Sequence, residues 1–153
     1  GKTALLFAAA TFFGYYSLNQ SALQNRQAFY LGQAIGMAFQ LRDDLIDYQV
    51  DVELSGKPRM QDVQNGIYTA PLILGLQEDP SLRQQLKERG QPWSQQELDR
   101  LYQALVDLGT LTETERLVDN YLTKAEKRLR GLGGKQESQT LVNLLNQVMR
   151  GHF

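Results

Sequence analysis

The 153-residue sequence contains no cysteine, one histidine and four prolines. Without cysteine, the chain can form neither a disulfide framework nor a thiolate metal site. The single histidine, His152, is the penultimate residue. This excludes a multi-histidine metal site and disfavours a histidine-based catalytic triad, because chain ends fray. A metal ion held by this chain alone should therefore be a hard cation on oxygen ligands.

Strong charge of either sign is also missing, since the formal net charge is -1. Nucleic-acid binding through a strongly basic surface is therefore disfavoured. The apolar run from Ala4 to Phe13 is far shorter than the ~20 residues that cross a bilayer, so no transmembrane segment is expected. Lys2 and this run imitate a signal peptide, but no convincing cleavage site follows. We interpret the run as a buried helix and expect a cytoplasmic protein.

Hydrophobic periodicity predicts an all-α chain, with no strand, internal repeat or linker between domains. We expect one domain over residues 1–153, in which residues 1–75 form core helices and residues 76–153 form peripheral ones. The predicted helices lie at 3–16, 22–50, 69–77, 78–90, 92–109, 112–134 and 137–153.

Several helix ends have recognisable signals. Ser21 can cap the helix that follows it, and Pro71 is tolerated in the first turn of the helix at 69–77. Ser94 and Glu97 have the spacing of a capping box, and Gly109 should end that helix. The segment 53–71, rich in glycine, proline and polar residues, is predicted to be a loop. One apolar face of the helix at 92–109 should carry Leu98, Leu101, Leu105 and Leu108.

Carboxylates concentrate near the end of the long helix at 22–50. At 100° per residue, Gln40, Asp43, Asp44 and Asp47 form one stripe about two turns long. Crowded carboxylates raise one another's pKa unless a cation joins them. Mg²⁺ is satisfied by one or two carboxylates together with waters and phosphate oxygens. The stripe is thus either a solvated acidic helix face or one side of a metal–diphosphate site.

Two neighbouring features favour the metal–diphosphate site. The stripe follows residues 32–40, whose apolar and small side chains are typical of a helix buried inside a bundle. Lys57 and Arg59 follow in the next loop, where they could meet phosphate charge or complement the helix dipole and the aspartates. Lys2 and Thr3, at the start of the first helix, also suit phosphate binding, although an exposed lysine near a chain end is the simpler interpretation.

In order, the motifs resemble the C-terminal half of trans-isoprenyl diphosphate synthases, the polyprenyl synthetases. The matching residues are Lys2-Thr3, Phe39-Gln40, Asp43 to Tyr48, Gly56-Lys57-Pro58 and Asp62 to Pro71. They cover about the first seventy residues. The resemblance implies an all-α bundle around an apolar cavity, in which a Mg²⁺-bound allylic diphosphate ionises and alkylates isopentenyl diphosphate.

The resemblance also implies roles for individual residues. Asp43, Asp44 and Asp47 would hold Mg²⁺ against the allylic diphosphate, which Lys2 and Lys57 would contact. Thr3 and Gln40 would lie near the reacting centre, and Phe39 would pack against the isopentenyl group. The implied catalytic residues are Lys2, Thr3, Gln40 and Asp43, and the implied substrate-binding residues are Lys2, Thr3, Phe39, Gln40 and Lys57.

The sequence departs from the family pattern in two ways. The family's earlier aspartate-rich motif is absent, so we expect this chain alone to be inactive and to need the other half from a longer enzyme or from a partner chain. Ile67 also occupies a position that is commonly lysine in the family. The resemblance favours a homodimer or a heterodimer. A non-catalytic subunit of a heteromeric synthase, a terpene cyclase and a ligand-free helical module are the alternatives.

Overall fold

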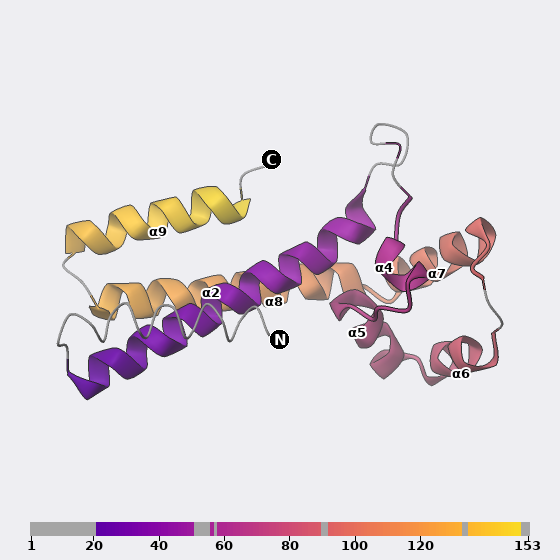
Figure 1. The fold of residues 1–153 in the computed structure, drawn as a ribbon, viewed down its shortest axis with the longest axis horizontal. Helices are drawn as coiled ribbons and strands as arrows, with labels where there is room; N and C mark the ends of the chain where they lie inside the picture. Colours follow the sequence, from indigo (N-terminus) through magenta and orange to yellow (C-terminus); the bar gives the residue numbers. More distant parts are fainter. Residues whose placement is uncertain (1–20, 51–55, 57, 90–91, 133–134, 151–153) are drawn as a thin grey trace. The chain divides into compact units, whose positions relative to one another are not determined.

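The computed structural model describes residues 21–50, 56, 58–89, 92–132 and 135–150. The predicted helix at 3–16 lies outside these ranges. The described residues are helical apart from short connections and include no strand, which confirms the all-α prediction. The helices are α2 (Ala22–Gln49), α4 (Gln61–Gln64), α5 (Ala70–Glu78), α6 (Pro80–Glu88), α7 (Gln95–Asp107), α8 (Thr110–Leu132) and α9 (Lys135–Arg150) (Figure 1).

The chain divides into two compact units. Unit 1 comprises Gly1–Gln40 and Leu117–Phe153, and unit 2 comprises Leu41–Arg116. Helices α2 and α8 each contribute one part to either unit. The predicted division into core helices (1–75) and peripheral helices (76–153) does not coincide with these units and stays a prediction.

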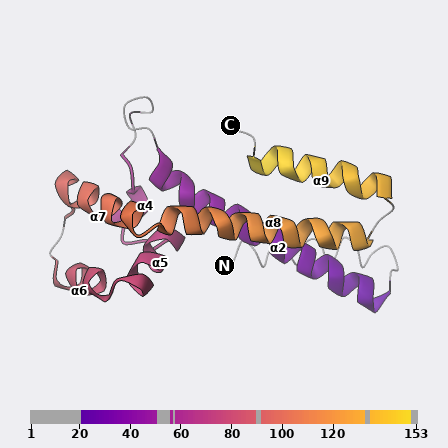
Figure 2. The same ribbon diagram turned by 180° about the vertical axis from the view of Figure 1, so that it is seen from behind.

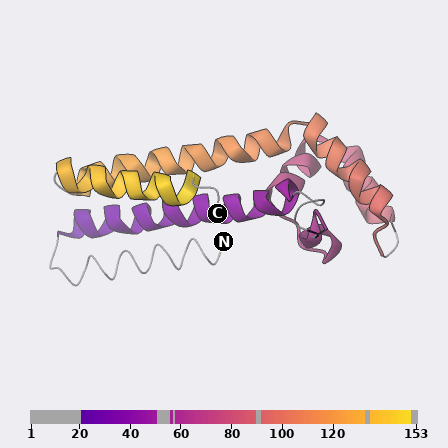
Figure 3. The ribbon, with the colours of Figure 1, turned by 90° about the horizontal axis from the view of Figure 1, so that it is seen from above.

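Unit 1 contains the first part of α2, the later part of α8 and α9, which Figures 1 and 3 show lying next to one another. Leu31 and Ala34 of α2 pack against Ala125 of α8, with Leu145 of α9 at the edge of this cluster. The Asn146 side chain donates to Glu126 Oε1 at 2.9 Å, which joins α9 to α8. Small residues on α2 and α8 thus allow a close helix contact, and larger leucines surround it.

Unit 2 contains the end of α2, helices α4 to α7 and the start of α8, shown from behind in Figure 2. Its core is a cluster of buried residues from the end of α2, the segment from Met60 through α4, and helices α5 to α7: Tyr48, Met60, Val63, Leu72, Leu82, Leu98, Leu101 and Leu105. Gly75 of α5 allows a close approach, because a Cβ atom there would meet Leu105 Cδ2. Unit 2 therefore places the aspartates of α2 beside a packed helical core.

The predicted helix ends are largely confirmed. Ser21 Oγ accepts from the Gln24 amide at 3.3 Å, Ser94 and Glu97 form a complete capping box, and Gly109 ends α7 with a φ of 72°. Two details differ from the sequence prediction. Leu108, the C-cap residue of α7, is 39% exposed and so does not share the burial of Leu98, Leu101 and Leu105. The predicted loop 53–71 contains the one-turn helix α4.

No helix in the described ranges is both long enough and apolar enough to cross a bilayer.

Candidate functional site

The three predicted metal ligands lie in the last two turns of α2 within unit 2. Asp43 is exposed, whereas Asp44 and Asp47 are half-buried. The structure therefore separates the three carboxylates by environment: Asp43 faces solvent, and the other two face the segment that follows α2.

Asp47 organises the start of α4. Its two carboxylate oxygens accept from the backbone amides of Gln61 at 2.9 Å and Asp62 at 3.1 Å. Its own carbonyl accepts from the Met60 amide at 2.9 Å. A carboxylate at a helix N-terminus satisfies unpaired amides and complements the helix dipole. Asp47 thus acts as a helix cap contributed from a distant part of the sequence.

Met60 precedes α4 in an unusual backbone conformation. Its φ of 58° and ψ of 40° lie in the left-handed region, and its side chain is buried. This region is sparsely populated by residues other than glycine, asparagine and aspartate. The bonds to Asp47 on either side of Met60, together with burial of its side chain in the core of unit 2, hold the residue in place.

Asp44 performs the corresponding role for α5. Its Oδ2 accepts from the Ala70 amide at 3.0 Å. The N-cap residue of α5, Thr69, makes no capping bond with its own side chain. Its hydroxyl is instead 3.1 Å from the buried Tyr48 hydroxyl. Burial is the main cause that raises the Tyr48 pKa, to about 12.

Asp62 is a fourth carboxylate in this region, and the sequence prediction gave it no role. It is half-buried, and burial raises its pKa, with further contributions from the charges of Asp47 and Asp44. The negative charges of Asp44 and Asp47 therefore repel that of Asp62 across the turn between α2 and α4. Its position at the first residue of the matched segment 62–71 was the available sequence signal.

Of the two cations predicted beside the stripe, Arg59 is described, and it contacts a backbone carbonyl and an aromatic ring. Arg59 Nε donates to the Val50 carbonyl at 3.4 Å. The guanidinium also stacks over the Tyr102 ring, 4.1 Å from its centroid. The sequence suggested either phosphate contact or a contact with the helix dipole. The bond to Val50 lies at the C-terminal end of α2, where a cation complements the helix dipole.

The donor set fits a hard cation, but these side chains form no closed cage. Asp43, Asp44 and Asp47 supply only carboxylate oxygens, the ligands that Mg²⁺ prefers. Within the ranges that the structure describes, no group of three or more acidic or histidine side chains is arranged to hold a metal ion. The Asp43 carboxylate is exposed and can reach a metal from solvent, whereas Asp44 and Asp47 also accept bonds from backbone amides. The arrangement suits a metal that takes its other ligands from substrate and water.

The remaining predicted residues are distributed as follows. Lys2, Thr3 and Lys57 lie outside the described ranges. Phe39 and Gln40 are half-buried on α2 and belong to unit 1. The substrate and catalytic roles of these residues stay predictions.

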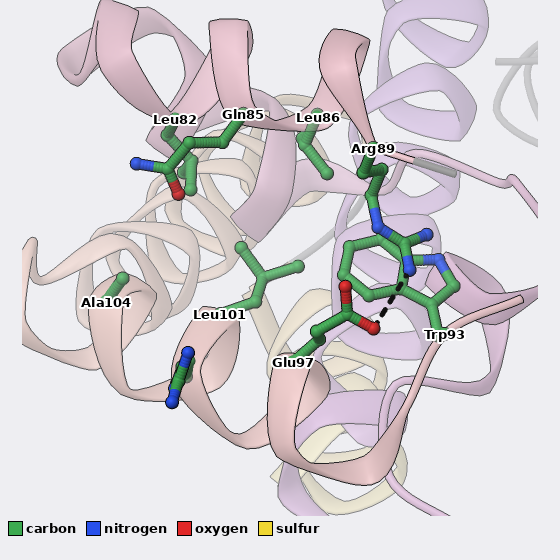
Figure 4. A pocket seen from close by; sticks show the side chains of 9 residues that line it. Leu82, Gln85, Leu86, Arg89, Trp93, Glu97, Leu101 and Ala104 are labelled. Carbon is green, nitrogen blue, oxygen red and sulfur yellow. Dashed lines mark hydrogen bonds and ion pairs between the residues drawn. The ribbon is translucent and has the colours of Figure 1, made fainter. Parts of the chain in front are cut away.

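A separate pocket of about 200 Å³ lies between α6 and α7 in unit 2 (Figure 4). Arg89 stacks on Trp93, 3.3 Å from the ring centroid, and its Nη2 lies 3.3 Å from Glu97 Oε2. Leu82, Leu86 and Leu101 supply apolar walls. Because Glu97 already neutralises Arg89, the pocket presents a small apolar hollow beside a satisfied ion pair.

The fold agrees with comparisons to known proteins. The family profile described as Polyprenyl synthetase matches residues 1–107. The chain belongs to the polyprenyl synthetase family. Component 2 of heptaprenyl diphosphate synthase from Bacillus subtilis is 25% identical over 152 residues, which are 99% of this chain and 43% of that protein.

Solved structures show the same similarity. A decaprenyl diphosphate synthase from Rhodobacter capsulatus is 30% identical with a TM-score of 0.83, covering 97% of this chain and 47% of that one. A polyprenyl synthase from Caulobacter crescentus, solved with calcium and isoprenyl diphosphate, is 28% identical with a TM-score of 0.76, covering 97% and 46%. The chain thus spans less than half the length of these relatives.

Proposed function

We propose that the protein acts as a trans-prenyltransferase, a polyprenyl diphosphate synthase that condenses an allylic diphosphate with isopentenyl diphosphate. Family membership supports the reaction class, and the aspartate stripe supports metal binding at the substrate diphosphate. The observation that carries the proposal is the exposed carboxylate of Asp43, which lies on α2 next to Asp44 and one turn before Asp47.

Mg²⁺ is the proposed metal, and when bound it would neutralise charge on the departing diphosphate. Asp43 would bind it through an exposed carboxylate, while Asp44 and Asp47 would also hold α5 and α4 in place. By resemblance, Lys2 and Lys57 contact the diphosphate, Thr3 and Gln40 lie near the reacting centre, and Phe39 packs against the isopentenyl group.

A second candidate function is the half-site subunit of a heteromeric synthase. Two relatives, from Bacillus subtilis and Geobacillus stearothermophilus, are named component 2 of heptaprenyl diphosphate synthase. By analogy, this chain would work only with a second protein. We propose a homodimer or a heterodimer, located in the cytoplasm.

The deciding assay uses the full-length protein with Mg²⁺, farnesyl diphosphate and isopentenyl diphosphate, with product length read by chromatography. Longer prenyl diphosphates from the protein alone would support the leading proposal. Product that forms only after a partner subunit is added would support the half-site function. If no product forms under either condition, both proposals fail.

Asp43→Asn tests the site within that assay. We expect turnover to fall by orders of magnitude, because the variant removes a charged metal ligand while changing little else at an exposed position. Asp99→Asn on α7 is the matched control, since Asp99 is also exposed and also lies on a helix. Similar turnover in the two variants would remove Asp43 from the mechanism.

A further inference from the structure

A cleft of about 630 Å³ lies in unit 1, between the start of α2 and the end of α8. Its volume falls within the usual range for ligand pockets. Two leucines and a glycine give it apolar surface, and two glutamines and three cations give it polar groups. The lining residues are Leu23, Gln24, Gln27, Lys124, Lys127, Arg128, Gly131 and Leu132.

Neutral groups hold two of the three cations in place. Arg128 Nη1 donates to Gln27 Oε1 at 2.7 Å, and the guanidinium lies 4.9 Å from the centroid of the Tyr30 ring. Lys124 Nζ lies 4.8 Å from the centroid of the Tyr121 ring. An amide oxygen and an aromatic face orient a cation without cancelling its charge.

No carboxylate forms an ion pair with these cations within the described part of the chain. The ion pairs found there are Arg89–Glu97 and Arg116–Glu113, both in unit 2. The nearest acid along α8, Glu126, accepts instead from Asn146. Lys124, Lys127 and Arg128 are therefore not paired with a carboxylate, unlike Arg89 in the other pocket.

Other charges in unit 1 do not offset the three positive charges of the cleft. Along the sequence, α2 carries no acid before Asp43, and its positive dipole end lies at Ala22, beside the cleft. The negative end of α8 is equivalent to roughly half a unit charge, too little to offset three cations. Over all its residues, unit 1 has eight lysines and arginines against three aspartates and glutamates, a net charge of +5.

We propose that this cleft is a binding site for a phosphate ester with an aliphatic group. Lysine ammoniums and an arginine fork suit a phosphate dianion. The side chain of Leu23, 61% exposed, and that of Leu132 offer apolar surface to the aliphatic group. Two sources share this chemistry: a free phosphate ester and the headgroup of an anionic phospholipid.

The test compares the full chain with two charge-matched variants. Lys124→Gln/Lys127→Gln removes two exposed cations from the cleft and leaves the Arg128 contacts intact. Lys87→Gln/Arg100→Gln removes two exposed cations from unit 2. The probes are hexyl phosphate, followed by calorimetry, and sedimentation with vesicles of phosphatidylcholine with or without phosphatidylglycerol.

If the source is a free ester, hexyl phosphate should bind the wild type saturably, and the cleft variant should bind it at least about tenfold more weakly. If the source is a headgroup, only vesicles with phosphatidylglycerol should sediment the wild type, and the cleft variant should stay in solution. Either result supports the site. The proposal is overturned if the wild type binds neither probe, or if the wild type and the cleft variant bind equally well. It is also overturned if the control variant loses as much binding as the cleft variant.

This site does not depend on prenyl transfer. Asp43→Asn should bind hexyl phosphate and vesicles as the wild type does, because the cleft belongs to unit 1 and Asp43 to unit 2. Failure of the cleft proposal therefore leaves the proposed function untouched, and failure of the activity assay leaves the cleft proposal untouched.

Discussion

The carboxylate of Asp44 accepts a hydrogen bond from the backbone amide of Ala70 at 3.0 Å, joining the end of α2 to the first residue of α5. Asp47 makes the equivalent connection to α4. Two residues predicted as metal ligands thus also stabilise the fold, so a loss of activity on replacing either one would not by itself identify a ligand. The two roles must be measured separately, without metal and with it.

Replacing Asp44 by alanine should destabilise the metal-free protein. The variant leaves the Ala70 amide without its acceptor at a helix start, where loss of a cap typically costs about 1 kcal/mol. Asp44→Asn keeps an acceptor oxygen and should cost less. Urea unfolding in the presence of EDTA would measure the free energy of unfolding for both variants.

Asp43→Ala is the control for this measurement. Asp43 is exposed, and removing one of several neighbouring acids should change stability by less than about 0.5 kcal/mol. If Asp43→Ala and Asp44→Ala lose the same stability, Asp44 has no capping role.

The sequence was sufficient to predict most helices because their signals are local. The cap at Ser21, the capping box at Ser94 and the stop at Gly109 each depend on residues within one turn. Helix α4 was missed for the opposite reason. Its four residues carry no periodic pattern, and its cap comes from Asp47, fourteen residues before Gln61. Such an element becomes visible only when its tertiary partner is in place.

The candidate site was predictable in composition but not in arrangement. Helical spacing identified Asp43, Asp44 and Asp47 as neighbours. Spacing could not show that Asp44 and Asp47 bind backbone amides, because those amides belong to segments whose path is set by packing. The involvement of Asp62 was missed for the same reason, since its proximity to Asp47 follows from the turn at Met60.

Tyr48→Phe should change the pH dependence of stability. The folded-state pKa of about 12 exceeds the ordinary value of 10.0, so the folded protein favours the neutral hydroxyl. The stabilising contribution is complete below the unfolded-state pKa and is lost as the pH rises toward the folded-state pKa. The wild type should lose about 1.4 kcal/mol from this group by about pH 11.

Tyr48→Phe should lose none of this pH-dependent stability, because phenylalanine does not ionise. At about pH 9 it should be less stable than the wild type by about 1 kcal/mol, because Thr69 loses its hydroxyl partner. The difference should shrink or reverse by about pH 11, measured by urea unfolding at each pH. Tyr68→Phe, at a half-exposed position, should follow the wild type. A constant difference between Tyr48→Phe and wild type would show that Tyr48 ionises normally.

Asp62→Asn should stabilise the metal-free protein at neutral pH. Burial and the charges of Asp47 and Asp44 raise the Asp62 pKa, so the folded state disfavours its carboxylate. Stability from this group is present below the unfolded-state pKa and is lost as the pH rises through the folded-state value. The gain should be a few tenths of a kcal/mol, the usual scale for like charges near a surface.

The gain for Asp62→Asn should vanish near pH 3, where the wild-type carboxyl is itself neutral. Thermal unfolding in EDTA at both pH values would measure it. Asp99→Asn controls for a simple change in net charge, because Asp99 is an exposed acid on α7. A loss of stability in Asp62→Asn at neutral pH would show that the carboxylate makes a favourable contact.

Gly75→Ala should destabilise unit 2 although alanine is the better helix former. The new methyl group would meet Leu105 Cδ2, and Leu105 is fully buried in the core of the unit. Overpacking costs roughly 1–3 kcal/mol, against a helix-propensity gain of about 1 kcal/mol or less. Gly131→Ala on α8 is the control, because a Cβ atom there has nothing within 4 Å and only the propensity gain applies.

A second variant separates the steric cause from any effect on the α5 backbone. Leu105→Val shortens the obstructing side chain, so Gly75→Ala should cost less in that background than in the wild type. Residues in contact couple by about 0.5–3 kcal/mol in such double-mutant cycles. Urea unfolding of the four proteins would give the coupling free energy. Strictly additive effects would mean that Leu105 is not what keeps position 75 a glycine.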